Sequence, residues 1–173
     1  MHKDPADFRP DITHQSLLSL MDSPLNKAGK LEVFITTTTN QVIKINSATK
    51  IPRTYKRFAP LIAQLMKKLT IRADENGEIL LKIVQSPVTN HLPSDSLKVA
   101  FSTKAKLINV HDFIKEVNPQ KPIVFLVGAV AKGNPTMEVD YYQESYCISR
   151  YSLSASKCIE RLMSSFEILW DIC

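Results

Sequence analysis

The chain has 173 residues, of which 44% are hydrophobic and 23% charged, and these values exclude a protein that is disordered throughout. Its length is that of one ordinary domain, so we expect a single domain over residues 1–173. The longest apolar run covers residues 122–131, about half of what a membrane-spanning helix needs. The four histidines and three cysteines show no metal-ligand spacing. The sequence therefore predicts neither a membrane partner nor a metal site.

Positive charge is concentrated in one part of the chain. Residues 33–73 contain eight lysines and arginines and no Asp or Glu, whereas the rest of the chain holds 14 basic and 17 acidic residues. A basic run is often only a solvated face. An acid-free run of 41 residues, with Tyr55 among its basic side chains, also fits contact with a polyanion such as RNA. Charge alone does not distinguish RNA from DNA or from an anionic membrane, so at this point we expect only a polyanion-binding segment at residues 41–72.

The first half of the chain predicts two helices and a hairpin. Residues 11–22 are expected to form a short helix with Asp11 as its N-cap. Residues 31–37 and 41–45 are β-rich and are separated by a short turn, which predicts a β-hairpin. Residues 54–69 form an amphipathic pattern that is typical of a helix.

The second half predicts strands that alternate with helices. Strands are expected at 79–84, 97–102, 123–127 and 144–149, and helices at 110–117 and from 153 to the end of the chain. The run 123–127 is entirely apolar, which is typical of a strand covered on both faces. The alternation predicts an α/β fold with a mostly parallel sheet, whose ligands bind beyond the carboxyl ends of the strands.

Two of the four glycines, Gly128 and Gly133, lie directly after the apolar strand. Glycine allows a close backbone approach to a ligand. The spacing matches neither a phosphate-binding P-loop nor a dinucleotide fingerprint. Two interpretations remain open: a tight strand exit without a ligand, or a small-molecule site built from backbone amides and carbonyls.

Several segments together resemble one family, the eukaryotic small-subunit rRNA pseudouridine-N1 methyltransferases of ribosome biogenesis. The matching segments, in the order of that family, are 9–18 (RPDITHQSLL), 21–26 (MDSPLN), 51–58 (IPRTYKRF), 127–129 (VGA), Gly133 and 148–155 (ISRYSLSA). They cover almost the whole chain, so their combination is far more specific than any one of them.

The resemblance implies a SPOUT-type α/β knot, with a mostly parallel sheet and a C-terminal trefoil knot. It implies S-adenosylmethionine as cofactor, small-subunit rRNA as substrate, a homodimer, and action in the nucleolus of the nucleus. Ribosome-assembly proteins are further candidate partners. The family has a first β-strand upstream of its Arg-Pro-Asp motif, and this chain starts just before that motif, so we expect that strand to be absent and the domain to be N-terminally truncated.

The resemblance also assigns site residues. The cofactor-binding residues it implies are Phe101, Gly128, Gly133, Asn134, Pro135, Ile148, Ser149, Arg150, Tyr151, Ser152 and Leu153. It implies that the basic segment at residues 41–72 binds RNA, and the RNA-binding residues it implies are Arg9, Lys50, Arg53 and Arg57. Asp11 and Arg9 are the implied catalytic pair, with Asp11 either orienting Arg9 or acting directly. The chain departs from the family at Arg150 and Ser152, where an Asn and a Pro are usual, and at Lys50, where an Arg is common.

Two classes of function follow. The first is an enzyme that methylates N1 of a pseudouridine in small-subunit rRNA, or, less favoured, one that modifies a different RNA. The second is an rRNA-binding assembly factor whose positioning role outweighs or replaces methylation. In either class, the residue spacing predicts that Arg53 and Arg57, four residues apart at the start of the helix expected over 54–69, project from one face. We expect Arg9 to join them in one patch.

Overall fold

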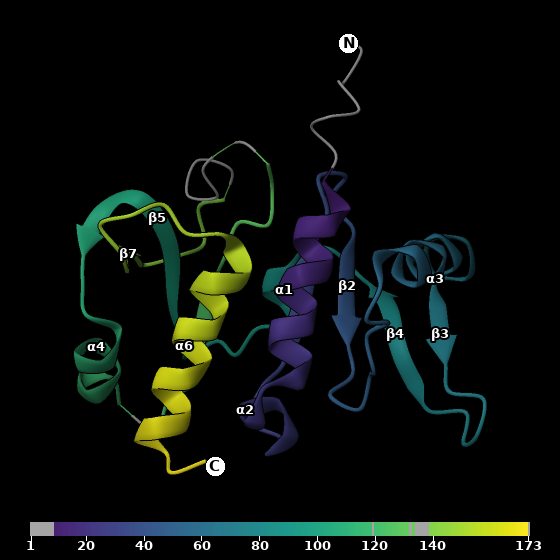
Figure 1. The fold of residues 1–173 in the computed structure, drawn as a ribbon, viewed down its shortest axis with the longest axis horizontal. Helices are drawn as coiled ribbons and strands as arrows, with labels where there is room; N and C mark the ends of the chain where they lie inside the picture. The colour runs from purple at the N-terminus through teal and green to yellow at the C-terminus, as the bar shows by residue number, and fades with distance from the viewer. Residues whose placement is uncertain (1–8, 119, 132, 134–138, 173) are drawn as a thin grey trace. The chain divides into compact units, whose positions relative to one another are not determined.

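The structure is a computed structural model that describes residues 9–118, 120–131, 133 and 139–172. Its contacts divide the chain into two compact units. The first unit comprises residues 1–19 and 92–173, and the second comprises residues 20–91. Figure 1 shows the elements of both units coloured along the chain.

The first unit contains a three-stranded parallel sheet. Its strands are β5 (Leu97–Leu107), β6 (Ile123–Leu126) and β7 (Glu144–Cys147), in the order β6-β5-β7. Both pairings are parallel, and the central residues Val99 and Ala100 of β5 are fully buried. The expected α/β fold with a parallel sheet is therefore confirmed in this unit.

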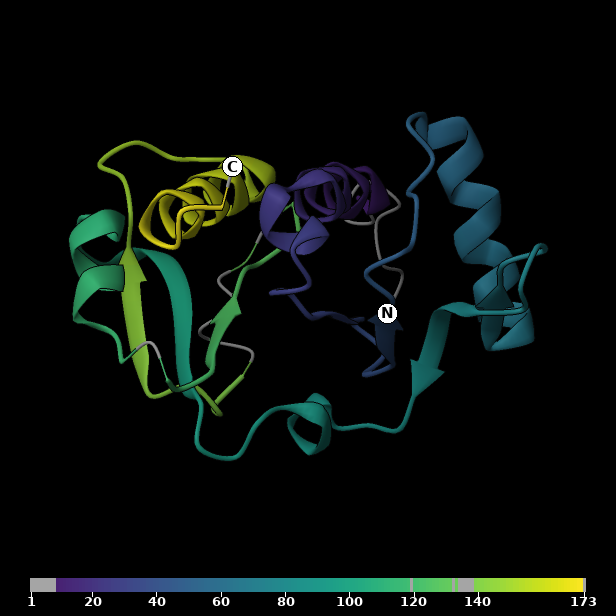
Figure 2. The same ribbon diagram turned by 90° about the horizontal axis from the view of Figure 1, so that it is seen from below.

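Two helices pack against this sheet. Helix α6 (Ala155–Leu169) contacts α4 (Val110–Glu116), and Figure 2 shows α6 lying along one face of the sheet. The ring of Phe166 on α6 meets that of Phe125 on β6, with centroids 5.7 Å apart, and Phe125 also stacks on Phe101 of β5 at 5.5 Å. These three rings join the helix to both strands.

The second unit is built around an antiparallel sheet. Its strands are β1 (Val33–Thr36), β2 (Val42–Ile45), β3 (Thr70–Arg72) and β4 (Ile79–Val84), in the order β1-β2-β4-β3. Helix α3 (Tyr55–Lys68) contacts β3 and β4 and buries Phe58 and Leu65. The unit also holds α2 (Pro24–Lys27) and a 3-10 turn at Val88–His91.

Most predicted elements are confirmed, and two details are wrong. The hairpin β1–β2, the helix α3 and the C-terminal helix α6, capped by Ser154, all form. Helix α1 (Pro10–Asp22) begins at Pro10, so Asp11 lies in its first turn and is not the N-cap. Proline suits the first helical position because its missing N–H would have no partner there. The trefoil knot stays a prediction.

The second wrong detail concerns β6. Its apolar run was expected to be covered on both faces, but all four residues are partly exposed. The reason is that β6 lies at the edge of the sheet, while β5 occupies the centre. The structure also adds β3 and extends β5 to Leu107, five residues beyond the predicted end. Among the described residues, no helix has the length and apolar character to cross a membrane.

The aromatic contacts make a prediction about stability. Phe166 is 4% exposed, whereas Ile168, two residues along the same helix, is 71% exposed. We expect Phe166→Ala to lower the free energy of unfolding by about 3–5 kcal/mol and Ile168→Ala to change it by about 0.5 kcal/mol or less. Urea denaturation of both variants measures this, and equal losses in the two would contradict the packing described for α6.

Candidate functional site

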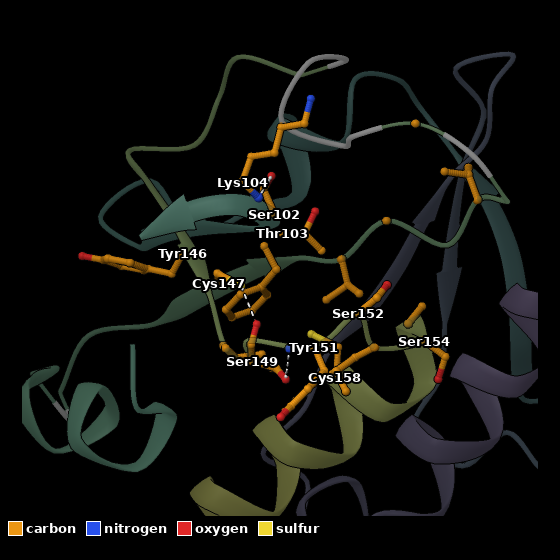
Figure 3. Close-up of a pocket in the computed structure, with 18 of the residues that line it drawn as sticks. Ser102, Thr103, Lys104, Tyr146, Cys147, Ser149, Tyr151, Ser152, Ser154 and Cys158 are labelled. Atoms are coloured by element: carbon orange, nitrogen blue, oxygen red, sulfur yellow. Dashed lines mark hydrogen bonds between the residues drawn. The ribbon is translucent and has the colours of Figure 1, made fainter. Parts of the chain in front are cut away.

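A pocket of about 720 Å³ lies in the first unit. It is lined by residues that follow β6 and β7, by Phe101–Lys104 of β5, and by the start of α6 (Figure 3). Because the three strands are parallel, the loops after β6 and β7 both leave the sheet at the end where the strands have their carboxyl ends. The pocket is therefore at the position where open α/β sheets bind ligands.

The pocket brings together most of the expected cofactor residues. Its lining includes Phe101, Gly128, Gly133, Ile148, Ser149, Tyr151, Ser152 and Leu153. Arg150 is not among the described lining residues, and Asn134 and Pro135 lie outside the described residues. The two glycine positions and the segment 148–153 are far apart in sequence, so parallel pairing of β6 and β7 with β5 is what joins them.

The structure also adds lining residues that the predicted set of cofactor-binding residues did not include, although some lie in the matched segments 127–129 and 148–155. They are Ile12, Ser102, Thr103, Lys104, Val127, Val130, Ala131, Tyr146, Cys147, Ser154, Ala155 and Cys158. Several of these added residues are next in sequence to cofactor-binding residues that were expected. Thr103 and Lys104 lie beyond the predicted end of β5 at residue 102, although the alternation of Lys104 and Lys106 with Ala105 and Leu107 could have marked its continuation.

Specific contacts hold the loop between β7 and α6. Arg161 on α6 donates from Nη1 to the carbonyl oxygen of Ile148, 3.1 Å away. The N–H of Tyr151 donates to Oγ of Ser149 at 3.0 Å. Ser154 caps α6 by accepting a hydrogen bond from the N–H of Lys157 at 3.2 Å. On the opposite loop, Gly133 has φ 121°, a conformation that side chains disfavour.

The pocket lining is nearly uncharged. Among the described lining residues, Lys104 carries the only charged side chain, and the others contribute apolar groups, hydroxyls and the thiols of Cys147 and Cys158. Tyr151 is 82% exposed, so its ring lies largely in solvent. Such a pocket suits a small ligand with both apolar and polar groups, held by hydroxyls and backbone atoms. No cluster of three or more metal-binding side chains occurs in the described part of the chain.

The expected catalytic pair forms a short ion pair. Nε and Nη2 of Arg9 donate to the two carboxylate oxygens of Asp11 at 2.8 and 2.7 Å. This hydrogen bonding lowers the pKa of Asp11 and raises that of Arg9. Both side chains are well exposed, so the pair contributes little to stability. Its effect is to fix the direction of the guanidinium.

The basic segment belongs to the second unit. Arg53 precedes α3, which begins at Tyr55 with Thr54 as N-cap. The prediction that Arg53 and Arg57 share one helical face is therefore wrong, because Arg53 is not in the helix. Arg53 instead pairs with Asp22, with Nη1 and Oδ2 2.6 Å apart. Whether Arg9 joins this segment stays a prediction, because Arg9 belongs to the first unit.

Cys158 gives a pH-dependent test of the pocket wall. Burial raises the pKa of this thiol from 9.0 to about 11, so the folded protein retains the proton more strongly than the unfolded chain. We expect the alkylation rate of Cys158 in the folded protein to keep rising until about pH 11, and in the urea-unfolded chain to level off near pH 9.0. Residue-resolved mass spectrometry measures both rates; identical pH profiles would contradict the buried position.

The chain is similar in sequence to known proteins. The chain is 42% identical over 172 residues to the ribosomal RNA small subunit methyltransferase NEP1 of Candida albicans, which covers 99% of this chain and 64% of that protein. It is 44% identical over 170 residues to the human protein of the same name, covering 98% of this chain and 68% of the relative. The chain thus spans about two thirds of these relatives' length.

A solved structure has the same fold. It is Archaeoglobus fulgidus Nep1 bound to S-adenosylhomocysteine, with a TM-score of 0.77 and 24% sequence identity. The match covers 94% of this chain and 72% of that one. One protein-family model also matches residues 1–167 of this chain. From this match and the two relatives, we conclude that the chain belongs to the EMG1/NEP1 methyltransferase family.

Proposed function

We propose that this protein transfers a methyl group from S-adenosylmethionine to N1 of a pseudouridine in small-subunit rRNA during ribosome biogenesis. The observation that carries the proposal is the pocket at the strand ends of the first unit, in a chain of this methyltransferase family. The pocket volume falls within the about 300–1,000 Å³ that is usual for small-molecule sites.

The lining residues fit this cofactor. Phe101 offers an aromatic surface to an adenine ring, and the loops at Gly128 and Gly133 allow close backbone approach. Hydroxyls of Ser149 and Ser152 suit ribose. Lys104 would attract a carboxylate, and it is the only charged side chain among the described lining residues that would repel a sulfonium.

When bound, S-adenosylmethionine supplies an electrophilic methyl group, so the protein's main contribution is alignment of donor and acceptor. The accepting ring nitrogen must lose a proton. Asp11 is a weak base for this, because its hydrogen bond to Arg9 lowers its pKa and both its oxygens accept from Arg9. We therefore assign to Asp11 the orientation of Arg9, and to Arg9 a contact with RNA.

The RNA contacts in this proposal come from four basic side chains. Arg9, Lys50, Arg53 and Arg57 are all exposed or half exposed, as phosphate-binding groups must be. The segment Lys50–Arg57 lies within the acid-free run of the sequence. A target base in an RNA loop would be turned outward to reach the methyl donor.

We also propose a homodimer that acts in the nucleolus, with ribosome-assembly proteins as further partners. Ile168, Leu169 and Trp170 at the end of α6 are exposed apolar residues, which supports a contribution of this helix to a two-fold interface. Sedimentation equilibrium at micromolar concentration tests the dimer, and a purely monomeric protein would argue against it.

Methyl transfer tests the proposed reaction. Labelled S-adenosylmethionine is supplied with a stem–loop RNA that contains pseudouridine, or with the same RNA containing uridine. We expect labelling of the first RNA alone. Equal labelling of both RNAs, or none, contradicts the proposal. RNA binding without detectable cofactor binding would favour the assembly factor, whose main support is the acid-free basic run.

Substitutions of the two arginines test the RNA contacts. We expect Arg53→Ala or Arg57→Ala to weaken RNA binding by roughly 1–3 kcal/mol if the side chain reads a base, and to flatten the salt dependence if it contacts phosphate. Neither variant should lose thermal stability, because both side chains are exposed. Unchanged binding in both variants and in the double variant, at near-physiological salt, would leave this segment as an ordinary solvated surface.

A further inference from the structure

We propose that Asp22 is a positioning residue for Arg53, and that it sharpens the discrimination between the target RNA and other RNA. This inference rests on the proposed function, because it concerns how Arg53 meets RNA. It starts from the ion pair between Arg53 Nη1 and Asp22 Oδ2, which are 2.6 Å apart.

The backbone around Arg53 is held by buried contacts. Asn26 is 2% exposed and donates from Nδ2 to the carbonyl oxygen of Ser47 at 3.0 Å. Thr49 is 5% exposed and donates from Oγ1 to the carbonyl oxygen of Leu80 at 2.8 Å. Ile51 is also buried. The loop that carries the basic residues is therefore anchored on both sides of Lys50.

The side chain of Arg53 has no such burial. It is 75% exposed, so packing does not select its direction. Within the described part of the chain, Asp22 is the acidic group that pairs with it. The pair occupies one nitrogen and leaves the other donors of the guanidinium available to solvent, to the edge of a base or to a phosphate. Asp22 therefore sets the direction of the side chain without blocking it.

The location of Asp22 supports a role outside its own helix. Asp22 is the last residue of α1, and a carboxylate at a helix C-terminus is disfavoured by the helix dipole. Lys27, 3.8 Å from Oδ1, offsets part of this. The same helix carries Asp11 in its first turn, paired with Arg9. Two of the four proposed RNA-binding residues thus each have an aspartate from α1 as partner.

Two roles of Asp22 predict different results for Asp22→Asn: a general electrostatic effect on RNA binding, and the positioning of Arg53. Removing a negative charge beside a phosphate site would strengthen the binding of every RNA to a similar degree. Losing a positioning contact would instead reduce the preference for the correct RNA. The quantity to compare is therefore the ratio of the two dissociation constants, for a control RNA and for the target.

The experiment uses the full chain and two stem–loop RNAs of equal length and composition. One carries pseudouridine in its loop and is methylated by the unsubstituted protein; the other has a scrambled loop. We expect Asp22→Asn to lower the dissociation-constant ratio about two- to fivefold, the range for an exposed ion pair. Glu32→Gln is the matched control, since Glu32 forms an exposed pair with Lys44 at 3.1 Å in the same unit; its ratio should not change.

Two further variants make the test specific. In an Arg53→Ala background, Asp22→Asn should have no additional effect on the ratio, because Asp22 acts through Arg53. Asp22→Glu keeps the charge, displaces the carboxylate, and should give a smaller loss; it also serves if Asp22→Asn does not fold, as judged by circular dichroism. The positioning role is overturned if Asp22→Asn leaves the dissociation-constant ratio unchanged. It is also overturned if Asp22→Asn lowers the ratio by the same factor in the Arg53→Ala background. If the unsubstituted protein does not distinguish the two RNAs, the proposed function itself fails.

Discussion

Parallel pairing of β5 with both β6 and β7 is the constraint on which the pocket depends. Parallel strands have their carboxyl ends at the same end of the sheet. The loop after β6, with its glycines, therefore lines the same pocket as the loop between β7 and α6. The contact of Arg161 with the Ile148 carbonyl then holds the second loop against α6. If β6 or β7 were antiparallel to β5, the loop after that strand would leave the sheet at the opposite end, and the two loops would not line one pocket.

The elements were largely predictable from sequence, because they follow local patterns. The apolar spacing of α3 and α6 and the turn at residues 38–40 marked real elements. The edge position of β6 was not predictable, since an apolar run does not reveal which strand lies at the centre. The three-residue strand β3 was too short to show a periodic signal, whereas the alternation of Lys104 and Lys106 with Ala105 and Leu107 could have marked the end of β5.

The candidate site was predicted through family resemblance and not through spacing. Gly128 and Gly133 alone left open a strand exit without a ligand, and only the match of several segments linked them to residues 148–153. Lys104 and Cys158 had no motif to mark them, and the fold brings them into the lining. The pairing of Arg53 with Asp22 joins residues 31 positions apart. It was not predicted, because Arg53 was expected to lie at the start of the helix.

The central claim is that the pocket of the first unit holds the methyl donor. Backbone amide NMR of the protein titrated with S-adenosylhomocysteine tests it directly, because it shows where the ligand binds. We predict shifts at the amides of Gly128, Gly133 and Ser149–Leu153, while those of the β1–β4 sheet stay in place. Shifts confined to the basic segment Lys50–Arg57, or no shifts at saturating ligand, would contradict the account.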